Sequence, residues 1–222
     1  MSYFELDLRS YDKIVIIGDT HGDKNAHLKG IQKAEQLDLP SLHLGDVNMG
    51  PNAYDYLLPY KDRHFFLRGN HENHLEAVNS PNCLHSYGII HLANCTAFFL
   101  SGAYSIDKAW RTPGTDWYHQ EELSFDRLLA AYKLYREVKP DVIFSHEFPP
   151  NVPYAIGING MNMGVEFRIS STTSQTLGLM TEFHKPKYHL AGHWHCGKKD
   201  KLFNEVLYNC LAINEARVFE YK

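Results

Sequence analysis

Five short apolar runs set the hydrophobic pattern of the chain, and each ends at a glycine or a polar residue. They span four or five positions and are rich in Val, Ile, Leu and Phe. This length is typical of strands that are buried on both faces. The runs cover residues 13–17, 41–44, 64–67, 141–144 and 188–191.

Helical spacing separates the first two runs. Within residues 25–37, Leu28, Ile31 and Leu37 recur on one helix face, and residues 38–40 end the pattern. The resulting strand–helix–strand unit predicts the α/β class. Further helices are expected near residues 52–58, 121–138 and 172–183, and strands within 88–100 and 205–221. No repeat or flexible linker interrupts the chain, so we expect one domain over residues 1–222.

Unusual polar residues follow all five runs. In open α/β sheets, ligands bind beyond the carboxyl ends of the strands. Asp19 and His21 are two positions apart, as are His193 and His195, so in an extended backbone each pair points to one side and can share a metal. The polar segments are Gly18-Asp19-Thr20-His21, Gly45-Asp46-Val47-Asn48, Arg68-Gly69-Asn70-His71-Glu72, Ser145-His146-Glu147 and Gly192-His193-Trp194-His195.

Composition narrows the function classes. The 222 residues are 44% hydrophobic and carry a net charge of −4, so no overall basic field exists to hold nucleic acid, and no stable nucleic-acid partner is expected. The chain shows no run of about 18 apolar residues and no leader-like start, which predicts no membrane association and a cytoplasmic protein. Its four cysteines form no CxxC pair and are expected to be reduced thiols.

Together, the five polar segments resemble the motifs of the calcineurin-like metallophosphoesterase superfamily, from Asp19 to His195. The resemblance implies a four-layer α/β/β/α sandwich, in which two mixed β-sheets face each other and helices flank them. It also implies two divalent metal ions that share Asp46. One ion would be held by Asp19, His21, Asp46 and His195, and the other by Asp46, Asn70, His146 and His193.

The implied metal centre favours an anionic substrate. Two divalent ions bring a charge of +4, from which the two carboxylates remove 2, and the surplus attracts phosphate oxygens. The family's reaction is attack on phosphorus by a hydroxide that bridges the metals. His71 matches the histidine that protonates the leaving oxygen, Arg68 matches an arginine that grips phosphate, and Asn70 would contact substrate as well as metal. The mixed N and O ligands suit Mn²⁺, the ion we expect, but also Fe, Zn, Co or Ni.

Two departures favour a phosphodiesterase acting on a small nucleotide-like, possibly cyclic, diester. Protein Ser/Thr phosphatases carry Gly-Asp-x-Val-Asp-Arg-Gly, whereas residues 45–50 read Gly-Asp-Val-Asn-Met-Gly and lack the second Asp and the Arg. The last motif of those phosphatases usually reads Gly-His-Thr-Pro. Here the same motif contains a second histidine, His195, as it does in the diesterase and nuclease branches. A phosphomonoesterase, a dinucleotide pyrophosphohydrolase, a nuclease and a non-catalytic scaffold remain as alternatives. Oligomeric state stays open.

Residues 102–122 show no clear period and are expected to form an ordered connection. They resemble, more loosely, a segment of small bacterial and bacteriophage metallophosphoesterases. Trp110 could stack on a base and Arg111 could meet a phosphate. Alternatively, the aromatic residues pack on the sheets and Arg111 pairs with Glu121 or Glu122. Asp23 and Glu72 are candidate acceptors for histidine ring N–H groups, and the loop over residues 149–164 is expected to overhang the site.

Overall fold

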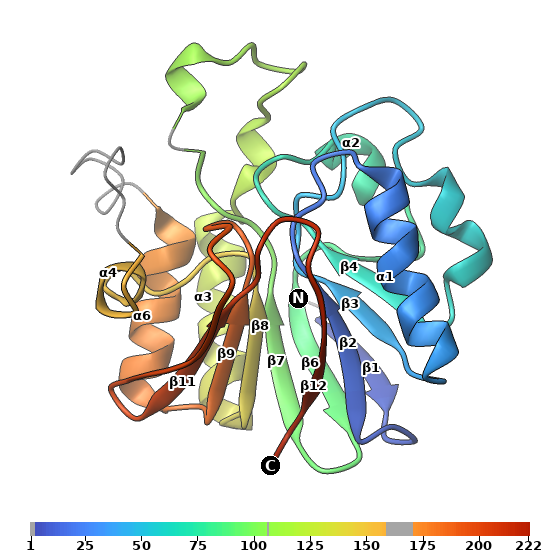
Figure 1. Ribbon diagram of the computed structural model, residues 1–222. Helices are drawn as coiled ribbons and strands as arrows, with labels where there is room; N and C mark the ends of the chain where they lie inside the picture. Colours follow the sequence, from blue (N-terminus) through green and yellow to red (C-terminus); the bar gives the residue numbers. More distant parts are fainter. Residues whose placement is uncertain (1–2, 106, 159–170) are drawn as a thin grey trace.

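The protein is a sandwich of two mixed β-sheets with helices on both outer sides (Figure 1). The computed structural model describes residues 3–105, 107–158 and 171–222. The four-layer α/β/β/α arrangement predicted from the sequence is therefore confirmed. Between the sheets lies an apolar core that includes Ile16, Leu44, Phe99 and Phe144.

The larger sheet has seven strands and contributes one half of this core. Strands β7, β8, β9 and β11 run parallel to one another, whereas β6 and β10 pair antiparallel with β7 and β11. In spatial order the strands are β1 (Phe4–Leu8), β6 (Tyr87–Leu92), β7 (Thr96–Leu100), β8 (Val142–Ser145), β9 (Tyr188–Ala191), β11 (Val206–Cys210) and β10 (Lys198–Phe203).

The smaller sheet has five strands, of which four are parallel. Its central strands are buried on both faces because the core covers one side and helices cover the other. In spatial order they are β12 (Ala216–Glu220), β2 (Lys13–Ile17), β3 (Ser41–His43), β4 (His64–Leu67) and β5 (Cys83–Leu84), with β12 antiparallel to β2.

The longer helices cover the outer faces of the sheets. Helix α1 (Lys24–Gln36) lies on the smaller sheet, where Ile31 packs with strand residues of β2 and β4. Helices α3 (Phe125–Val138) and α6 (Thr172–Phe183) lie on the larger sheet. Short turns of helix are α2 (His74–Ala77), α4 (Val152–Ala155), η1 (Asp55–Tyr60), η2 (Lys108–Trp110) and η3 (His119–Glu121). Among the described helices, none has the length and apolar character needed to cross a membrane.

Most of the expected helices and strands are present, but some begin at other residues or have another type than the sequence predicts. The five apolar runs all contain strands, whereas residues 52–58 give only the 3₁₀ turn η1, which contains Pro59. Helix α3 starts after Ser124 and not at residue 121, because residues 119–121 form η3. Strands β1, β5 and β10 were not anticipated. Of the loop expected to overhang the site, residues 159–164 lie outside the described residues.

Several buried histidines are neutral, and His27, His74 and His189 are expected to make the fold less stable in acid. Burial lowers the pKa of His27, His74 and His189 from 6.5 to about 3 in each case. The unfolded chain therefore binds more protons at these three side chains below pH 6.5, and each of them contributes a loss of stability of about 1.4 kcal/mol per pH unit as the pH falls. Urea unfolding from pH 7.5 to 4.5 measures the total slope, from which His189→Gln should remove about 1.4 kcal/mol per pH unit. A slope that His189→Gln leaves unchanged would contradict the assignment.

Candidate metal centre

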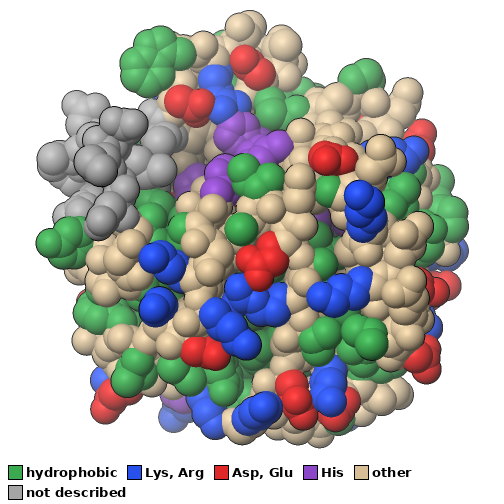
Figure 2. All heavy atoms as spheres, viewed as in Figure 1, with side chains coloured by type: hydrophobic (Ala, Val, Ile, Leu, Met, Phe, Trp, Pro, Cys, Tyr) green, Lys and Arg blue, Asp and Glu red, His purple; other side chains and the backbone are tan. Residues whose placement is uncertain are grey.

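The polar side chains that follow five strands come together at one edge of the sandwich. Residues after β2, β3 and β4 reach it from the smaller sheet, and residues after β8 and β9 reach it from the larger sheet. A group of histidine side chains is visible on this part of the surface (Figure 2). The side chains gathered there include Asp19, His21, Asp46, Asn70, His146, His193 and His195.

Four of these residues hold a left-handed backbone conformation. Their φ angles are 44° at His21, 60° at Asp46, 62° at His193 and 54° at His195. Such values cost on the order of 1–3 kcal/mol for residues other than glycine, and they collect at functional sites. The strained turns after the strands aim these side chains toward one another.

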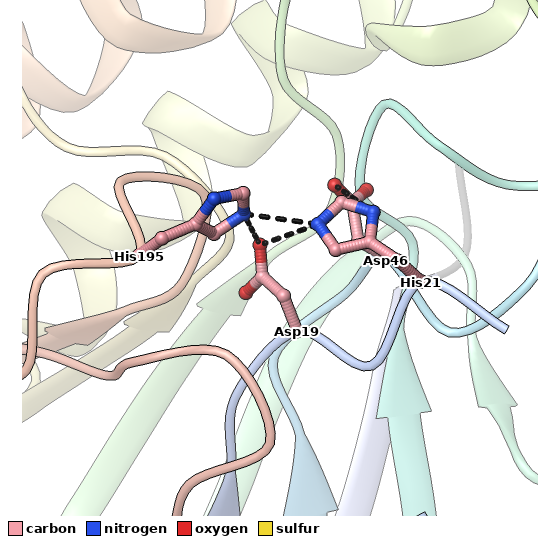
Figure 3. A group of neighbouring side chains, drawn as sticks. All are labelled: Asp19, His21, Asp46 and His195. Carbon is pink, nitrogen blue, oxygen red and sulfur yellow. Dashed lines mark hydrogen bonds and ion pairs between the residues drawn. The ribbon is translucent and has the colours of Figure 1, made fainter. Parts of the chain in front are cut away.

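The first cluster consists of Asp19, His21, Asp46 and His195 (Figure 3). The His195 Nε2 atom lies 2.8 Å from Asp19 Oδ2 and 3.0 Å from His21 Nε2. His21 also approaches Asp46, with 3.9 Å between Nδ1 and Oδ2. One donor atom from each of the four residues falls within 4.8 Å of the others, which is the spacing of ligands around one ion.

The second cluster consists of Asp46, His146 and His193, with Asn70 beside them. His146 Nε2 lies 3.3 Å from Asp46 Oδ1 and 3.2 Å from Asn70 Oδ1. The Asn70 amide donates to Ser105 Oγ, which turns its carbonyl oxygen toward His146. Asp46 thus belongs to both clusters, and the arrangement is consistent with a dinuclear centre.

Two observations indicate that the clusters fit metal ions. Asp46 Oδ2 is buried and has no hydrogen-bond partner among the described residues, although an unpaired buried carboxylate oxygen is costly. Glycines also leave room for the carboxylates. A Cβ at Gly69 would lie 2.1 Å from Asp46 Oδ1, and one at Gly192 would lie 2.1 Å from Asp19 Oδ1.

The electrostatics of the chain alone point the same way. Burial opposes protonation of His146, but the carboxylates of Asp46 and Asp19 outweigh it and raise its pKa to about 10. In turn, His146 holds the pKa of Asp46 well below its usual range, against the effect of burial. A proton on His146 thus balances a carboxylate in the absence of other cations. Divalent ions would replace such protons, because ligands bind in their deprotonated forms.

Buried carboxylates brace the loops that carry the clusters. Glu72 accepts from the backbone of Val47 and from the Tyr54 hydroxyl, and burial raises its pKa to about 7. Glu147, which the sequence did not single out, has its Oε2 atom 3.5 Å from His193 Nε2.

The expectation that Asp23 and Glu72 accept from histidine rings was wrong. Asp23 instead caps helix α1 by accepting from Ala26 N, and Glu72 holds backbone amides.

His71 lies at the margin of the first cluster. Its backbone N–H donates to Asp46 Oδ1 at 2.7 Å, and its ring centroid is 5.2 Å from that of His21. The Arg111 guanidinium contacts the His71 ring, with Nη1 2.7 Å from Nδ1. Arg111 pairs with Asp107, so the alternative pairing with Glu121 or Glu122 was wrong.

Arg68 is buried beside the site, and its guanidinium donates hydrogen bonds to neighbouring backbone carbonyl oxygens. Its guanidinium donates to the carbonyl oxygens of His85 and Gln120, and Nη1 lies 2.9 Å from His74 Nδ1. Only about 5% of the residue is exposed, and burial lowers the pKa of the guanidinium. These partners anchor helix α2 and the 102–122 segment. The predicted contact of Arg68 with substrate therefore stays a prediction.

Comparisons with known proteins concern the family and the fold of the chain. Residues 12–197 match the profile of a family described as calcineurin-like phosphoesterase. Phosphopantetheinyl hydrolase (PptH) from Mycobacterium tuberculosis has a similar structure, with 12% identity, a TM-score of 0.55 and 91% of both chains covered. A hypothetical protein from Thermus thermophilus aligns with 13% identity and a TM-score of 0.49, over 90% of this chain and 75% of the other. A search of curated proteins found no match.

Proposed function

Because the chain belongs to the calcineurin-like phosphoesterase family, we propose that it hydrolyses a small, nucleotide-like phosphodiester as one catalytic domain. The observation that carries this proposal is the position of His195. Its Nε2 atom lies within 3.0 Å of both Asp19 and His21, so the second histidine of the last motif completes the first cluster. By resemblance to the family, a second histidine at this place is typical of the diesterase and nuclease branches, whereas the protein phosphatases usually carry Gly-His-Thr-Pro there.

The residues of the two clusters would hold two divalent ions, for which we propose Mn²⁺. When bound, such ions polarise phosphate oxygens and lower the pKa of water. Asp46 would join the two positions, with Asp19, His21 and His195 on one side and Asn70, His146 and His193 on the other. Glu72 and the left-handed turns hold these ligands in place before substrate arrives, so little reorganisation is needed.

His71 is the proposed general acid. As the bond between phosphorus and the leaving oxygen breaks, a ring N–H of His71 passes its proton to that oxygen. The backbone N–H of His71 is fixed to Asp46 Oδ1, which ties the acid to the residue shared by both clusters. Asn70, the residue before His71, would contact the phosphate as well as an ion.

We propose that the protein is cytoplasmic, which suits its four free cysteines.

One panel of substrates tests the proposal. The protein, reconstituted with Mn²⁺, is compared on an aryl phosphodiester, an aryl phosphomonoester, 2′,3′- and 3′,5′-cyclic nucleotides and a single-stranded oligonucleotide, with EDTA as the control. Preference for the small diesters, lost on chelation, is the expected result. A preference for the monoester or for the oligonucleotide would overturn the substrate class, and absence of any hydrolysis would favour a scaffold.

His71→Ala should slow esters with poor leaving groups most. General acid catalysis contributes roughly 10²- to 10⁴-fold when the leaving oxygen needs a proton, and much less for an activated aryl ester. We expect kcat for an alkyl ester to fall by at least about 100-fold, while the aryl diester loses roughly tenfold or less. Metal content should be unchanged. Equal losses on both esters would argue against His71 as the acid.

A further inference from the structure

We propose that Arg111, held in place by Asp107, is a positioning residue for His71. The inference rests on the proposed function, because His71 needs a fixed ring only if it delivers a proton during ester hydrolysis. Arg111 and Asp107 both belong to the segment between β7 and α3, which rises above the edge of the sandwich in Figure 1. This segment therefore supplies a part of the active site that no metal motif contains.

The guanidinium of Arg111 is engaged on every side. Nε lies 2.7 Å from Asp107 Oδ1 and Nη2 lies 2.6 Å from Asp107 Oδ2, which is the bidentate geometry of a strong ion pair. Nη1 donates to the backbone oxygen of Asp116 at 2.9 Å. The Arg111 side chain is only 16% exposed. Its orientation is thus set by acceptors on both sides of it in the sequence.

Two atoms of this fixed group face the two ring nitrogens of His71. Nη1 lies 2.7 Å from Nδ1, and Nη2 lies 3.1 Å from Nε2. Because a guanidinium only donates, the neutral ring accepts from Arg111 at one of these nitrogens and carries its proton on the other. A hydrogen bond from a fixed donor restricts rotation of the ring about its bond to Cβ. Because proton transfer requires a donor within hydrogen-bond reach of the leaving oxygen, such a restriction favours catalysis.

The local sequence explains why His71 needs a partner from a distant segment. The loop over residues 45–50 contains no carboxylate after Asp46 that could pair with the ring, since Asn48 and Met49 follow Val47. Asp107 instead fixes Arg111, whose guanidinium meets the ring as a donor and not as a carboxylate acceptor.

The competing interpretations are that Arg111 only fastens its own segment, or that it only binds the phosphate. A fastening role predicts a lower melting temperature and equal losses of kcat on all esters. A phosphate-binding role predicts a higher KM with little change in kcat. A positioning role predicts a loss of kcat that depends on the leaving group, as for His71→Ala itself.

The test uses the Mn²⁺-loaded protein with Arg111→Ala and Asp107→Asn, and Arg9→Ala as the matched control. Arg9 also pairs in a bidentate manner with an aspartate, Asp7, but on the exposed surface. We expect Arg111→Ala to reduce kcat for an alkyl ester by roughly 10- to 100-fold and for an aryl diester by less than about threefold. Asp107→Asn should show the same pattern more weakly, and Arg9→Ala no change. Adding Arg111→Ala to His71→Ala should cause no further selective loss.

A second measurement does not depend on turnover. In metal-free protein, the NMR signal of the His71 ring, assigned by its loss in His71→Ala, should shift and broaden in Arg111→Ala but not in Arg9→Ala. Equal loss of kcat on both esters, a change in KM alone, or an unchanged ring signal would each overturn the proposal. If the wild-type protein hydrolyses no ester, the proposed function fails, and the ring signal alone still decides whether Arg111 positions His71.

Discussion

Asp46→Asn should lose phosphoesterase activity by at least roughly 10³-fold, because Asp46 is the carboxylate common to both clusters. An amide removes one negative charge and replaces one of the two ligand oxygens by a donor that cannot bind a cation. Both metal positions therefore weaken together, and metal analysis after dialysis should show less than one ion per chain. The fold should survive, since an Asn oxygen can still accept from His71 N.

Asp23→Asn is the matched control for this substitution. The substitution at Asp23 is the same change of an aspartate to an asparagine, close to the site. Asp23, however, is exposed and caps helix α1. Asparagine caps helices about as well as aspartate, so stability and activity should stay near wild type. If Asp46→Asn kept two ions and near-wild-type activity, the assignment of a shared carboxylate would be wrong.

Gly69→Ala should also lower activity strongly, without removing any of the proposed ligands. The added Cβ would lie 2.1 Å from Asp46 Oδ1 and 2.7 Å from both Asp46 N and His146 Nε2. Since the backbone cannot yield as a flexible side chain can, Asp46 and His146 must separate. We expect a loss of roughly 1–3 kcal/mol in stability and at least about 100-fold in activity, because misplacement by 1 Å already costs that much.

Gly50→Ala tests whether the Gly69 effect is one of space. Gly50 is also close to the site, but the nearest atom to its added Cβ is Asn48 Oδ1 at 3.4 Å. Alanine there should change neither the melting temperature nor the activity by much. Comparable losses in both variants would mean that glycine's flexibility, and not the contact with Asp46, matters at position 69.

The sequence pattern was sufficient to predict the α/β class and the meeting of the polar segments, because both depend on short-range order along the chain, whereas the four layers were implied by the family resemblance. Parallel strands buried on both faces leave continuous apolar runs, and their carboxyl ends must meet at one edge. Asp19 and His195 are 176 positions apart, yet each is marked by the strand before it. Family resemblance then assigned the ligands to two ions.

Other parts of the site depend on contacts that no local pattern reveals. Arg111 meets His71 across 40 positions, from a segment without periodicity, and the sequence equally allowed it a partner in Glu121 or Glu122. Glu147 carries no signal beyond following a histidine. Arg68 matches a family position, but whether its guanidinium turns inward depends on His74 and on the carbonyl oxygens of His85 and Gln120.

Each cluster draws its side chains from both sheets, and this has a consequence for folding in the cell if the proposed ions bind. Asp19, His21, Asp46 and Asn70 follow strands of the smaller sheet, whereas His146, His193 and His195 follow strands of the larger one. An ion bound at either position would fasten the two halves of the sandwich together. Each ion present at 100 times its dissociation constant would add about 2.7 kcal/mol to the free energy of unfolding. The melting temperature would then report metal supply, and metal starvation would lower the amount of folded protein as well as its activity.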